Sequence, residues 1–432
     1  MTASTDDRAS DLLRAARAVQ IWGLPLVFAQ RVRLGFTAPL DPDGPRPATS
    51  AGAPLGTMGH QRELSDPSLT AGVAPNVDTL YSLAFVDLDR GDATLRMPDV
   101  GDRYYSVQIG EADSTTAAVL GVRTHGSRLP TVRIGRRRAR SSESGEDVHV
   151  RCRTRYVMVA VRILVRPDDR GDTARVRELQ KRIVFEAPAT STPNPAARWL
   201  VERSREDERS DPAAFLDSLD HAMRALPRHD LPPSTAGDLT LVRDAVSSGD
   251  DRARVAVSRG LADGLAAVAD RVGSLGRSSN GWSTNLVGTD FGTDHLLRAA
   301  VAWSQIYVNP SDEALYPVCE VDRDGDALTG EREYTLTLTG DDPPPVRYFW
   351  SITVYHKRGL LCDNPIGRYA ITDRTPGLRR ETDGSVTVRL ATADAESTQD
   401  NWLPVPPGPF RLMMRLYGPL DPSWSPPPVV RS

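Results

Sequence analysis

The chain has 432 residues, 39% of them hydrophobic and 25% charged, with a formal net charge of -4. This length exceeds the size at which one hydrophobic core usually stops growing, so we expect two or three packed units. The composition is that of an ordinary globular protein, and the small net charge creates no general field that would attract nucleic acid. Nucleic acid is therefore not expected as a partner.

The cysteines and the N-terminal apolar segment bear on the cellular compartment. Cys152, Cys319 and Cys362 lie far apart, so the sequence predicts neither a disulfide framework nor a cysteine-based zinc site, and a cytoplasmic location fits best. The apolar residues 18–29 follow several aspartates and are interrupted by glycine and proline, which is not the pattern of a signal peptide. No other run approaches the roughly 20 apolar residues of a membrane-spanning helix, so no membrane partner is expected.

The N-terminal region predicts a buried helix followed by a long loop. Between residues 6 and 36 apolar side chains recur near helical spacing, and Pro25 is expected to kink or restart the helix. Residues 39–75 are rich in Pro, Gly, Ser and Asp without a sustained period, which is typical of a long surface connection. Long loops of this kind often border functional sites.

Two regions of short β-type runs are separated by helical sequence. Strands are predicted at residues 79–88, 103–109, 116–122, 155–165, 333–340, 346–356, 385–392 and 410–420. Helices are predicted at residues 174–185, 212–226, 237–248, 252–275 and 292–306. The expected fold is mainly β with a helical connector (α+β), with two antiparallel β-sandwich or jelly-roll-like domains bridged by helices. We expect an N-terminal helical segment at 1–38, a first β domain at 39–171, the helical connector at 172–307 and a second β domain at 308–432.

The common cofactor and metal motifs are missing from the sequence. It contains no GxxxxGK[ST] loop, no GxGxxG after a strand, no HExxH and no GxSxG. No cofactor is therefore expected, and the scattered histidines predict no local metal site. The acidic string from Asp322 has the spacing of a calcium loop but lacks its central glycine, and β-type sequence follows, so a tight turn is the better interpretation.

Polar residues of the first β region form a candidate catalytic group. Asn76 and Asp78 can hydrogen-bond nearby backbone to fix a turn, after which Tyr81 lies on one strand while Arg103 and Tyr105 begin another. In a shared cavity Asp78 would serve as acid or base, the two tyrosines as proton donors or hydrogen-bonding groups, and Arg103 as the binder of an anionic or carbonyl oxygen.

A structural interpretation of the same residues stays open. In that case the segment is an Asx-type turn followed by a tyrosine-rich strand, and Arg103 pairs with Asp78 or Asp87.

Several sequence strings carry a resemblance to known families. APNVDTLYSLAFVDL from Ala74, followed by RYYSVQ from Arg103, resembles the domain of unknown function 1254. YFWSITVY from Tyr348, NPIGRY from Asn364, NWLP from Asn401 and RLY from Arg415 resemble the domain of unknown function 1214. The resemblance implies two β-sandwich or jelly-roll-like domains bridged by helices in a homo-oligomer, and it implies no established activity.

The strand predicted at 346–356 has one apolar and one polar face. Alternation places Trp350 among apolar residues, and it places Ser351, Thr353 and Tyr355 on the opposite face. That polar face could line a pocket and meet Asn364, Arg368 and Trp402, or the aromatic residues could simply pack the sandwich. The predicted substrate-binding residues are Asn76, Thr79, Trp350, Tyr355, Asn364, Arg368 and Trp402.

Three functions are compatible with this sequence. The leading hypothesis is an intracellular enzyme that acts on a small organic molecule by acid–base chemistry of hydrolase, lyase or isomerase type, without a nucleotide cofactor. The second is a non-catalytic ligand-binding or oligomeric assembly protein. The third is a metal-dependent jelly-roll enzyme whose ligands, such as His60, His125 or His356, are brought together by folding. The expected partners are a small molecule and further copies of the chain.

Overall fold

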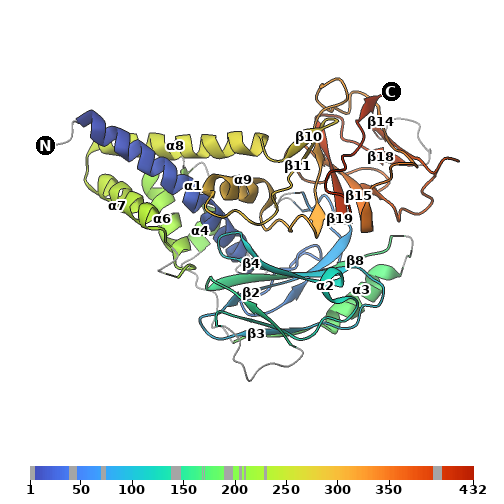
Figure 1. Ribbon diagram of the computed structural model, residues 1–432, viewed down its shortest axis with the longest axis horizontal. Coiled ribbons are helices and arrows are strands. Elements are labelled where there is room, and N and C mark those ends of the chain that lie inside the picture. The colour runs from blue at the N-terminus through green and yellow to red at the C-terminus, as the bar shows by residue number, and fades with distance from the viewer. Residues whose placement is uncertain are drawn as a thin grey trace.

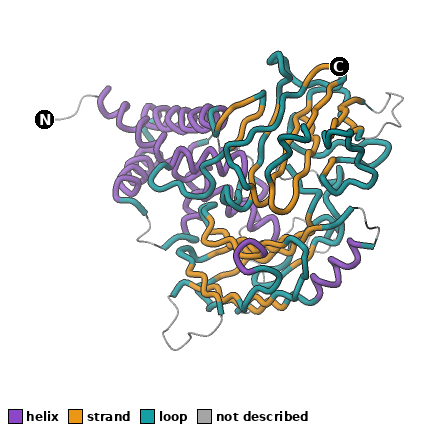
Figure 2. The backbone as a smooth tube through the Cα atoms, turned by 45° about the vertical axis from the view of Figure 1, so that its right-hand side comes forward, coloured by secondary structure: helices purple, strands orange, loops and turns teal. Residues whose placement is uncertain are grey.

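The computed structural model describes residues 5–37, 46–69, 74–137, 147–167, 169, 171–188, 198–203, 207–208, 211–227, 231–392 and 401–432. The chain forms two sheet domains and a helical bundle that lies at one side of the molecule, and two further helices accompany one of the sheet domains (Figure 1). A view turned by 45° shows the same separation (Figure 2). The predicted α+β fold with two sheet domains is confirmed.

The helical bundle is built around the first helix, α1, Thr5–Thr37. It packs against helices from the middle of the chain and buries Leu12, Val19 and Leu26 among them. The helix continues through Pro25, so the predicted restart there is wrong; packing on several sides holds it together although proline removes one backbone hydrogen bond. By length and composition α1 could also cross a membrane, but 72% of its most apolar window is buried inside the protein.

The middle of the chain supplies the other helices of the bundle. They are α4 Arg198–Glu202, α6 Pro212–Met223, α7 Pro233–Ser247, α8 Asp251–Gly273 and α9 His295–Gln305. Asp211, Asp250 and Asp294 cap α6, α8 and α9 by accepting hydrogen bonds from backbone N–H groups of the first turn. The predicted helices at 212–226, 237–248, 252–275 and 292–306 are confirmed within a few residues.

The first sandwich consists of a five-stranded and a four-stranded sheet. The larger sheet has the order β1 Gly59–His60, β2 Thr79–Asp87, β8 Tyr156–Leu164, β4 Tyr105–Glu111 and β5 Thr116–Gly121. The smaller sheet has the order β7 Val148–Arg151, β6 Val132–Gly135, β3 Ala93–Arg96 and β9 Val184–Glu186. Two helices, α2 Val122–His125 and α3 Asp172–Lys181, complete the unit.

The sequence predicted the long strands of this unit but not the smaller sheet. Strands β2, β4, β5 and β8 lie where apolar runs predicted them, whereas β3, β6, β7 and β9 have three or four residues each. The helix predicted at 174–185 ends at Lys181, because β9 follows and pairs with β3. Of the predicted connection at 39–75, residues 46–69 and 74–75 are described and the rest lies outside the described residues.

The second sandwich contains a seven-stranded and a four-stranded sheet. The larger sheet contains β10 Arg277–Ser279, β11 Trp282–Thr284, β13 Val318–Cys319, β19 Phe410–Pro419, β15 Val346–His356 and β16 Ala370–Thr372 in order, with β12 Ala314–Leu315 beside β19. The smaller sheet has the order β18 Trp402–Pro404, β17 Val386–Ala391, β14 Tyr334–Leu338 and β20 Val430–Arg431.

The acidic string after β13 forms the predicted tight turn. The Asp322 carboxylate accepts hydrogen bonds from the backbone N–H groups of Asp324 and Asp326, both at 3.0 Å, and forms an ion pair with Arg431. Gly325 has a positive φ of 87° within this turn.

Close contact between α1 and α8 depends on a glycine. A Cβ atom added at Gly260 would lie 2.4 Å from the backbone oxygen of Leu13, which is too short for any real contact. We expect Gly260→Ala to lower the free energy of unfolding by about 1 to 3 kcal/mol, because the helices must move apart. Urea unfolding measures this change.

A matched substitution in the same bundle serves as the control. Gly237 lies inside α7 with no atom within 4 Å of an added Cβ. Gly237→Ala is expected to stabilise the protein by about 0.5 to 1 kcal/mol through helix propensity. Equal losses in both variants would contradict the proposed role of the close contact.

Candidate functional site

The segment Ala74–Asp78 is held between the two sandwiches. Its Ala74 carbonyl accepts a hydrogen bond from Arg415 Nη2 at 2.8 Å, and its Pro75 carbonyl accepts one from the Tyr355 hydroxyl at 2.7 Å. Both donors come from the large sheet of the second sandwich. Because the segment leads directly into β2 of the first sandwich, these bonds fix the two sheet domains relative to each other.

The end of the same segment is fixed by a buried carboxylate. Asp78 accepts a hydrogen bond from Ser351 Oγ at 2.7 Å and one from Arg374 Nη2 at 3.2 Å. Asn76 uses its side-chain oxygen to accept from the Asp78 backbone N–H at 2.7 Å, which is the Asx turn that the sequence predicted.

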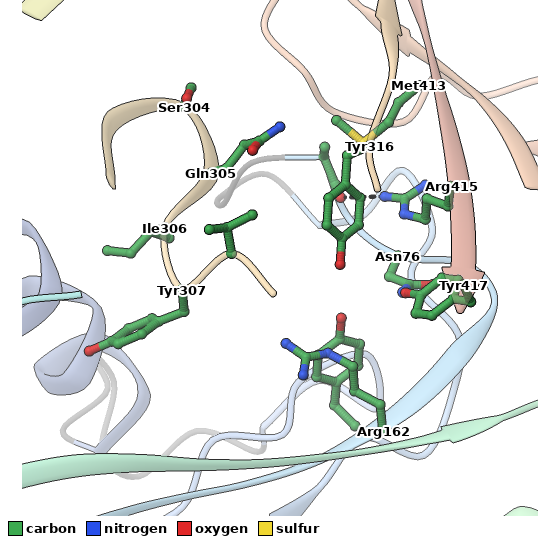
Figure 3. Close-up of a pocket in the computed structure, with 13 residues that line it drawn as sticks. Asn76, Arg162, Ser304, Gln305, Ile306, Tyr307, Tyr316, Met413, Arg415 and Tyr417 are labelled. Atoms are coloured by element: carbon green, nitrogen blue, oxygen red, sulfur yellow. Dashed lines mark hydrogen bonds between the residues drawn. The ribbon is translucent and has the colours of Figure 1, made fainter. Parts of the chain in front are cut away.

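A cavity of about 140 Å³ lies beside this segment, where the two sandwiches and the end of α9 meet. Figure 3 shows the side chains of Arg162 and Tyr316 directed toward the same space, with Tyr417 and Asn76 at its side. Apolar side chains complete the wall. The lining residues are Ala74, Asn76, Tyr81, Arg162, Ser304, Gln305, Ile306, Tyr307, Val308, Tyr316, Met413, Arg415 and Tyr417.

Arg162 is the most unusual group in the wall of this cavity. It lies on β8, in the middle of an apolar strand, and only 7% of its surface is exposed. Its Nη2 donates to Gln108 Oε1 at 2.8 Å, while Nη1 has no hydrogen-bond partner. Within the described part of the chain no carboxylate forms an ion pair with it. A buried guanidinium with a free N–H and no counter-charge is unfavourable by itself.

Gln108 holds Arg162 and the chain after α9 in place together. Its Nε2 donates to the backbone oxygens of Tyr307 at 2.9 Å and Val308 at 3.1 Å, which leaves its oxygen directed at Arg162. Tyr307 has a positive φ of 54°, and Figure 3 shows its ring directed away from the cavity. The chain therefore changes direction at Tyr307, and the next residue, Val308, lines the cavity.

Arg415 is the second guanidinium of the cavity wall, and its side chain is already committed to protein groups. It donates to Thr353 Oγ1 at 2.9 Å, to the Ala74 oxygen and to the Tyr355 hydroxyl at 2.7 Å. These acceptors are uncharged, and no ion pair joins Arg415 to a carboxylate of the described residues. Its positive charge is therefore added to that of Arg162.

Two phenols of the cavity wall have hydroxyl protons without an acceptor. The Tyr316 hydroxyl accepts a hydrogen bond from Asn309 Nδ2 at 2.7 Å, and the Tyr417 hydroxyl accepts one from Asn76 Nδ2 at 2.9 Å. Neither hydroxyl donates to a described protein group. Both protons are therefore available to an acceptor inside the cavity.

The environment displaces the pKa values of the cavity phenols in opposite directions. Burial alone would raise the pKa of Tyr81, but the charge of Arg162, whose guanidinium carbon lies 5.0 Å from the ring centroid, and that of Arg415 lower it below its ordinary value. Burial, together with the neighbouring phenols, raises the pKa of Tyr417 well above the ordinary value. Burial also raises the pKa of Tyr316. Opposite displacements within one site are typical of an acid and a base.

Of the predicted catalytic residues, the structure brings only Tyr81 to this cavity. Asp78 instead lines a different space, an open groove of about 800 Å³. The Tyr105 hydroxyl donates to the Gly126 backbone oxygen at 3.0 Å. Arg103 forms two 2.6 Å hydrogen bonds with Asp172, so the alternative pairing with Asp78 or Asp87 is wrong; α3 carries Asp172 to the arginine.

The predicted substrate-binding residues divide in the same way. Asn76 lines the cavity, whereas Thr79 is buried on β2 and Trp350 packs in the core of the second sandwich. Tyr355 contacts Pro75 and Arg415 at the edge of the cavity wall. Asn76 and Tyr81 are therefore the two predicted site residues that the cavity unites.

The remaining predicted residues form a separate local cluster. Asn364 Nδ2 donates to the Arg368 backbone oxygen at 3.0 Å, and Arg368 Nη1 donates to the Trp402 backbone oxygen at 2.8 Å. The polar face of β15 was expected to meet these residues, but it meets the Ala74–Asp78 segment. The residues that line the open groove include Arg368 together with Asp78.

Sequence reasoning missed Arg162, Tyr316 and Tyr417. A signal for Arg162 was present, because a charged residue interrupts the apolar run 155–165. The described residues contain no group of three or more His, Cys, Asp or Glu side chains that could hold a metal ion. His60 Nδ1 instead contacts Ser82 Oγ at 2.8 Å.

The fold and cavity define a two-sandwich α+β protein with a polar site between its sheet domains. The sequence-family model described as protein of unknown function (DUF1254) matches residues 55–187. The family model described as protein of unknown function (DUF1214) matches residues 313–421. The chain thus belongs to the proteins in which a DUF1254 region precedes a DUF1214 region. Asn76, Tyr81 and Arg162 lie in the first region, and Tyr316, Arg415 and Tyr417 in the second.

Two solved structures are similar to this chain at low sequence identity. The VPA0106 protein from Vibrio parahaemolyticus is 18% identical with a TM-score of 0.64, and the alignment covers 98% of this chain and 100% of that chain. A putative uncharacterized protein from Burkholderia cenocepacia is 14% identical with a TM-score of 0.47, covering 99% and 96%. No curated protein matches the sequence. The first likeness supports the fold alone.

The lowered pKa of Tyr81 can be measured directly. We expect the phenolate absorbance of the wild-type protein, minus that of Tyr81→Phe, to show one phenol that ionises below the ordinary tyrosine value of 10.0. In Arg162→Gln the same difference should move above that value, because burial then acts without the opposing charge. A Tyr81 titration that is the same with and without Arg162 would contradict the assigned cause.

The Arg103–Asp172 pair is expected to stabilise the fold rather than to serve a reaction. Burial alone would raise the Asp172 pKa. The hydrogen bonds from Arg103 and from the Arg166 backbone N–H lower it by more than burial raises it, so the net pKa lies below the ordinary 3.8. Asp172→Asn should cost about 3 to 5 kcal/mol at neutral pH, because Arg103 is left buried without a counter-charge.

The pH dependence of that loss follows from the direction of the shift. A carboxyl whose pKa is lower in the folded state contributes stability above its unfolded value and loses it as the pH falls through the folded value. The difference between wild type and Asp172→Asn should therefore shrink as urea unfolding is followed below pH 3.8. Asp102→Asn, at an exposed ion pair, is the control and should change stability far less.

Proposed function

We propose that this chain is an intracellular enzyme that acts on a small organic molecule by acid–base chemistry in the cavity between the two sandwiches, without a nucleotide cofactor. The observation that carries the proposal is one cavity in which Tyr81 lies beside the Arg162 guanidinium, whose carbon is 5.0 Å from the ring centroid, and the Tyr417 hydroxyl accepts from Asn76 without donating to a described group. The directions of the pKa shifts, lower for Tyr81 and higher for Tyr417, agree with this arrangement. A phenol with a lowered pKa can act as a base, and one with a raised pKa keeps a proton to donate. Tyr81 is then the base and Tyr417 the acid.

Proton transfer next to a carbonyl group is the step that this arrangement supports best. The Tyr81 phenolate takes a proton from the carbon beside the carbonyl, the electrons of that C–H bond form a carbon–carbon double bond, and the carbonyl π electrons move to oxygen. The Tyr417 hydroxyl donates a hydrogen bond to that oxygen as its negative charge grows.

The fate of the proton decides between the reaction classes. Return of the proton from Tyr81 to a different carbon completes an isomerisation. Expulsion of a leaving group from the next carbon, with a proton from Tyr417, completes an elimination of lyase type. A hydrolase would use the same base on a water molecule, with the carbonyl oxygen held in the same way.

The hydrogen bonding of the serine in the cavity wall does not suit a nucleophile, which favours proton transfer over covalent catalysis. Among the described residues that line the cavity, Ser304 is the one serine, and its hydroxyl donates to the Ala300 backbone oxygen at 2.9 Å. A nucleophilic hydroxyl would instead donate its hydrogen bond to a neighbouring base.

We also propose a cytoplasmic location and assembly as a homo-oligomer. The free thiols of Cys152, Cys319 and Cys362 agree with a reducing compartment.

Deuterium exchange tests the proposal with simple model compounds in place of the unidentified substrate. The protein is incubated in D2O with small ketones, oxo acids and esters, and proton NMR follows exchange at the carbon beside the carbonyl group. We expect Tyr81→Phe to lower the rate of exchange by about 10²- to 10⁴-fold, the usual contribution of a positioned acid or base.

The matched control removes a different buried hydroxyl. The Tyr334 hydroxyl accepts a hydrogen bond from the Thr329 backbone N–H in the core of the second sandwich, and Tyr334→Phe should exchange at the wild-type rate. Exchange that survives in Tyr81→Phe would sink the assignment of the base. Binding of compounds without any turnover would favour the ligand-binding alternative.

A further inference from the structure

The cavity between the sandwiches presents free hydrogen-bond donors. Arg162 Nη1 lacks a partner, and the hydroxyl protons of Tyr316 and Tyr417 have no described acceptor. The Asn76 side-chain oxygen, by contrast, is already occupied by the Asp78 backbone N–H. A ligand that satisfies these groups must therefore supply acceptor oxygens.

The charges around the cavity lead to the same conclusion. Two buried guanidiniums, Arg162 and Arg415, are 7% and 2% exposed, and neither forms an ion pair with a carboxylate of the described chain. The donors of Arg415 are taken by Thr353, Ala74 and Tyr355, so the free guanidinium N–H at the described cavity wall is that of Arg162. A ligand with one negative charge would pair with this group.

We propose that the substrate of this site is a small monocarboxylate, whose oxygens accept hydrogen bonds from Arg162 Nη1 and the Tyr316 hydroxyl. This inference rests on the proposed acid–base function and adds the charge class of the substrate. With the carboxylate held by these two donors, the Tyr417 hydroxyl is left to donate to the reacting carbonyl group. A guanidinium N–H and a phenol are strong donors to a carboxylate.

Size and charge together exclude larger or more highly charged anions. A cavity of about 150 Å³ holds one benzene molecule, and the cavity here is about 140 Å³, so the enclosed part of the ligand is of that size. A phosphate dianion would require a second free cation. Arg415 does not provide one, since its donors already bind Thr353, Ala74 and Tyr355.

Calorimetry with charged and neutral probes tests the charge class. Acetate, butyrate and benzoate are each compared with the corresponding amide, and inorganic phosphate is added as a dianion, on the full chain at neutral pH. We expect the best carboxylate to bind about 10- to 100-fold more tightly than its amide, which corresponds to one hydrogen bond to a charged group.

Variants separate the site from unspecific charge effects. Arg162→Gln should abolish the preference for the carboxylate, whereas Arg128→Gln, which removes the same charge at an exposed pair with Asp99, should keep it. If Arg162→Gln fails to fold, Tyr316→Phe takes its place, because it removes one hydroxyl and should weaken carboxylate binding several-fold while the amide is unaffected.

The outcomes distinguish this inference from the proposed function. Amides that bind as tightly as carboxylates, phosphate that binds more tightly, or no binding by any probe would each overturn the monocarboxylate. The Tyr81-dependent deuterium exchange of ketones and esters would be untouched by these results. If the wild-type protein catalyses no deuterium exchange but binds carboxylates selectively, the anion site stands and the proposed catalytic role is contradicted.

Discussion

The arrangement of the two sandwiches depends on the binding of Ala74–Asp78 by the large sheet of the second sandwich. The neighbouring domain binds four groups of this segment: Arg415 and Tyr355 bind the Ala74 and Pro75 carbonyls, Tyr417 binds Asn76, and Ser351 binds Asp78. Buried backbone groups must find partners. Since nearly all of these partners come from β15 and β19, the segment fixes the domain interface and the cavity wall at once.

The same contacts explain why the cavity has an excess of positive charge. Asp78 is the carboxylate nearest to this region in the sequence, but Arg374 occupies one of its oxygens and the Ser351 hydroxyl the other. Gln108, which is neutral, faces Arg162 where a carboxylate would neutralise it. The fold thus keeps a guanidinium buried beside Tyr81 and leaves room for a ligand or a phenolate to supply the negative charge.

The helical bundle contributes to the site through its last helix. The chain leaves α9 at Gln305, turns at Tyr307 and lays Val308 against the cavity, and Gln108 of β4 holds both carbonyls. A Cβ atom added at Gly110 of the same strand would lie 2.6 Å from the Tyr307 ring, so the ring packs directly on β4. Helices, first sandwich and second sandwich therefore each supply one wall.

Local sequence patterns were sufficient to predict the long elements and their order. Apolar alternation over 346–356 corresponds to β15, helical spacing corresponds to α6 through α9, and the turn at Asn76 and Asp78 lies where its side chains predicted it. These features depend on local periodicity and on hydrogen bonds between neighbours in the chain. The same locality explains why Tyr81 and Asn76, which flank that turn, were found as site residues.

The set of distant side chains that share the cavity follows from the tertiary fold alone. Arg162 and Tyr417 lie 255 positions apart in the sequence, and no periodicity relates them; they meet because β8 and β19 belong to sheets that the Ala74–Asp78 segment brings together. Arg103 pairs with Asp172 rather than with an acid of its own strands because the first residue of α3, which follows β8 in the chain, reaches it. A buried charge pairs with the oppositely charged group that the tertiary packing buries next to it. The identity of that group therefore depends on packing rather than on local sequence.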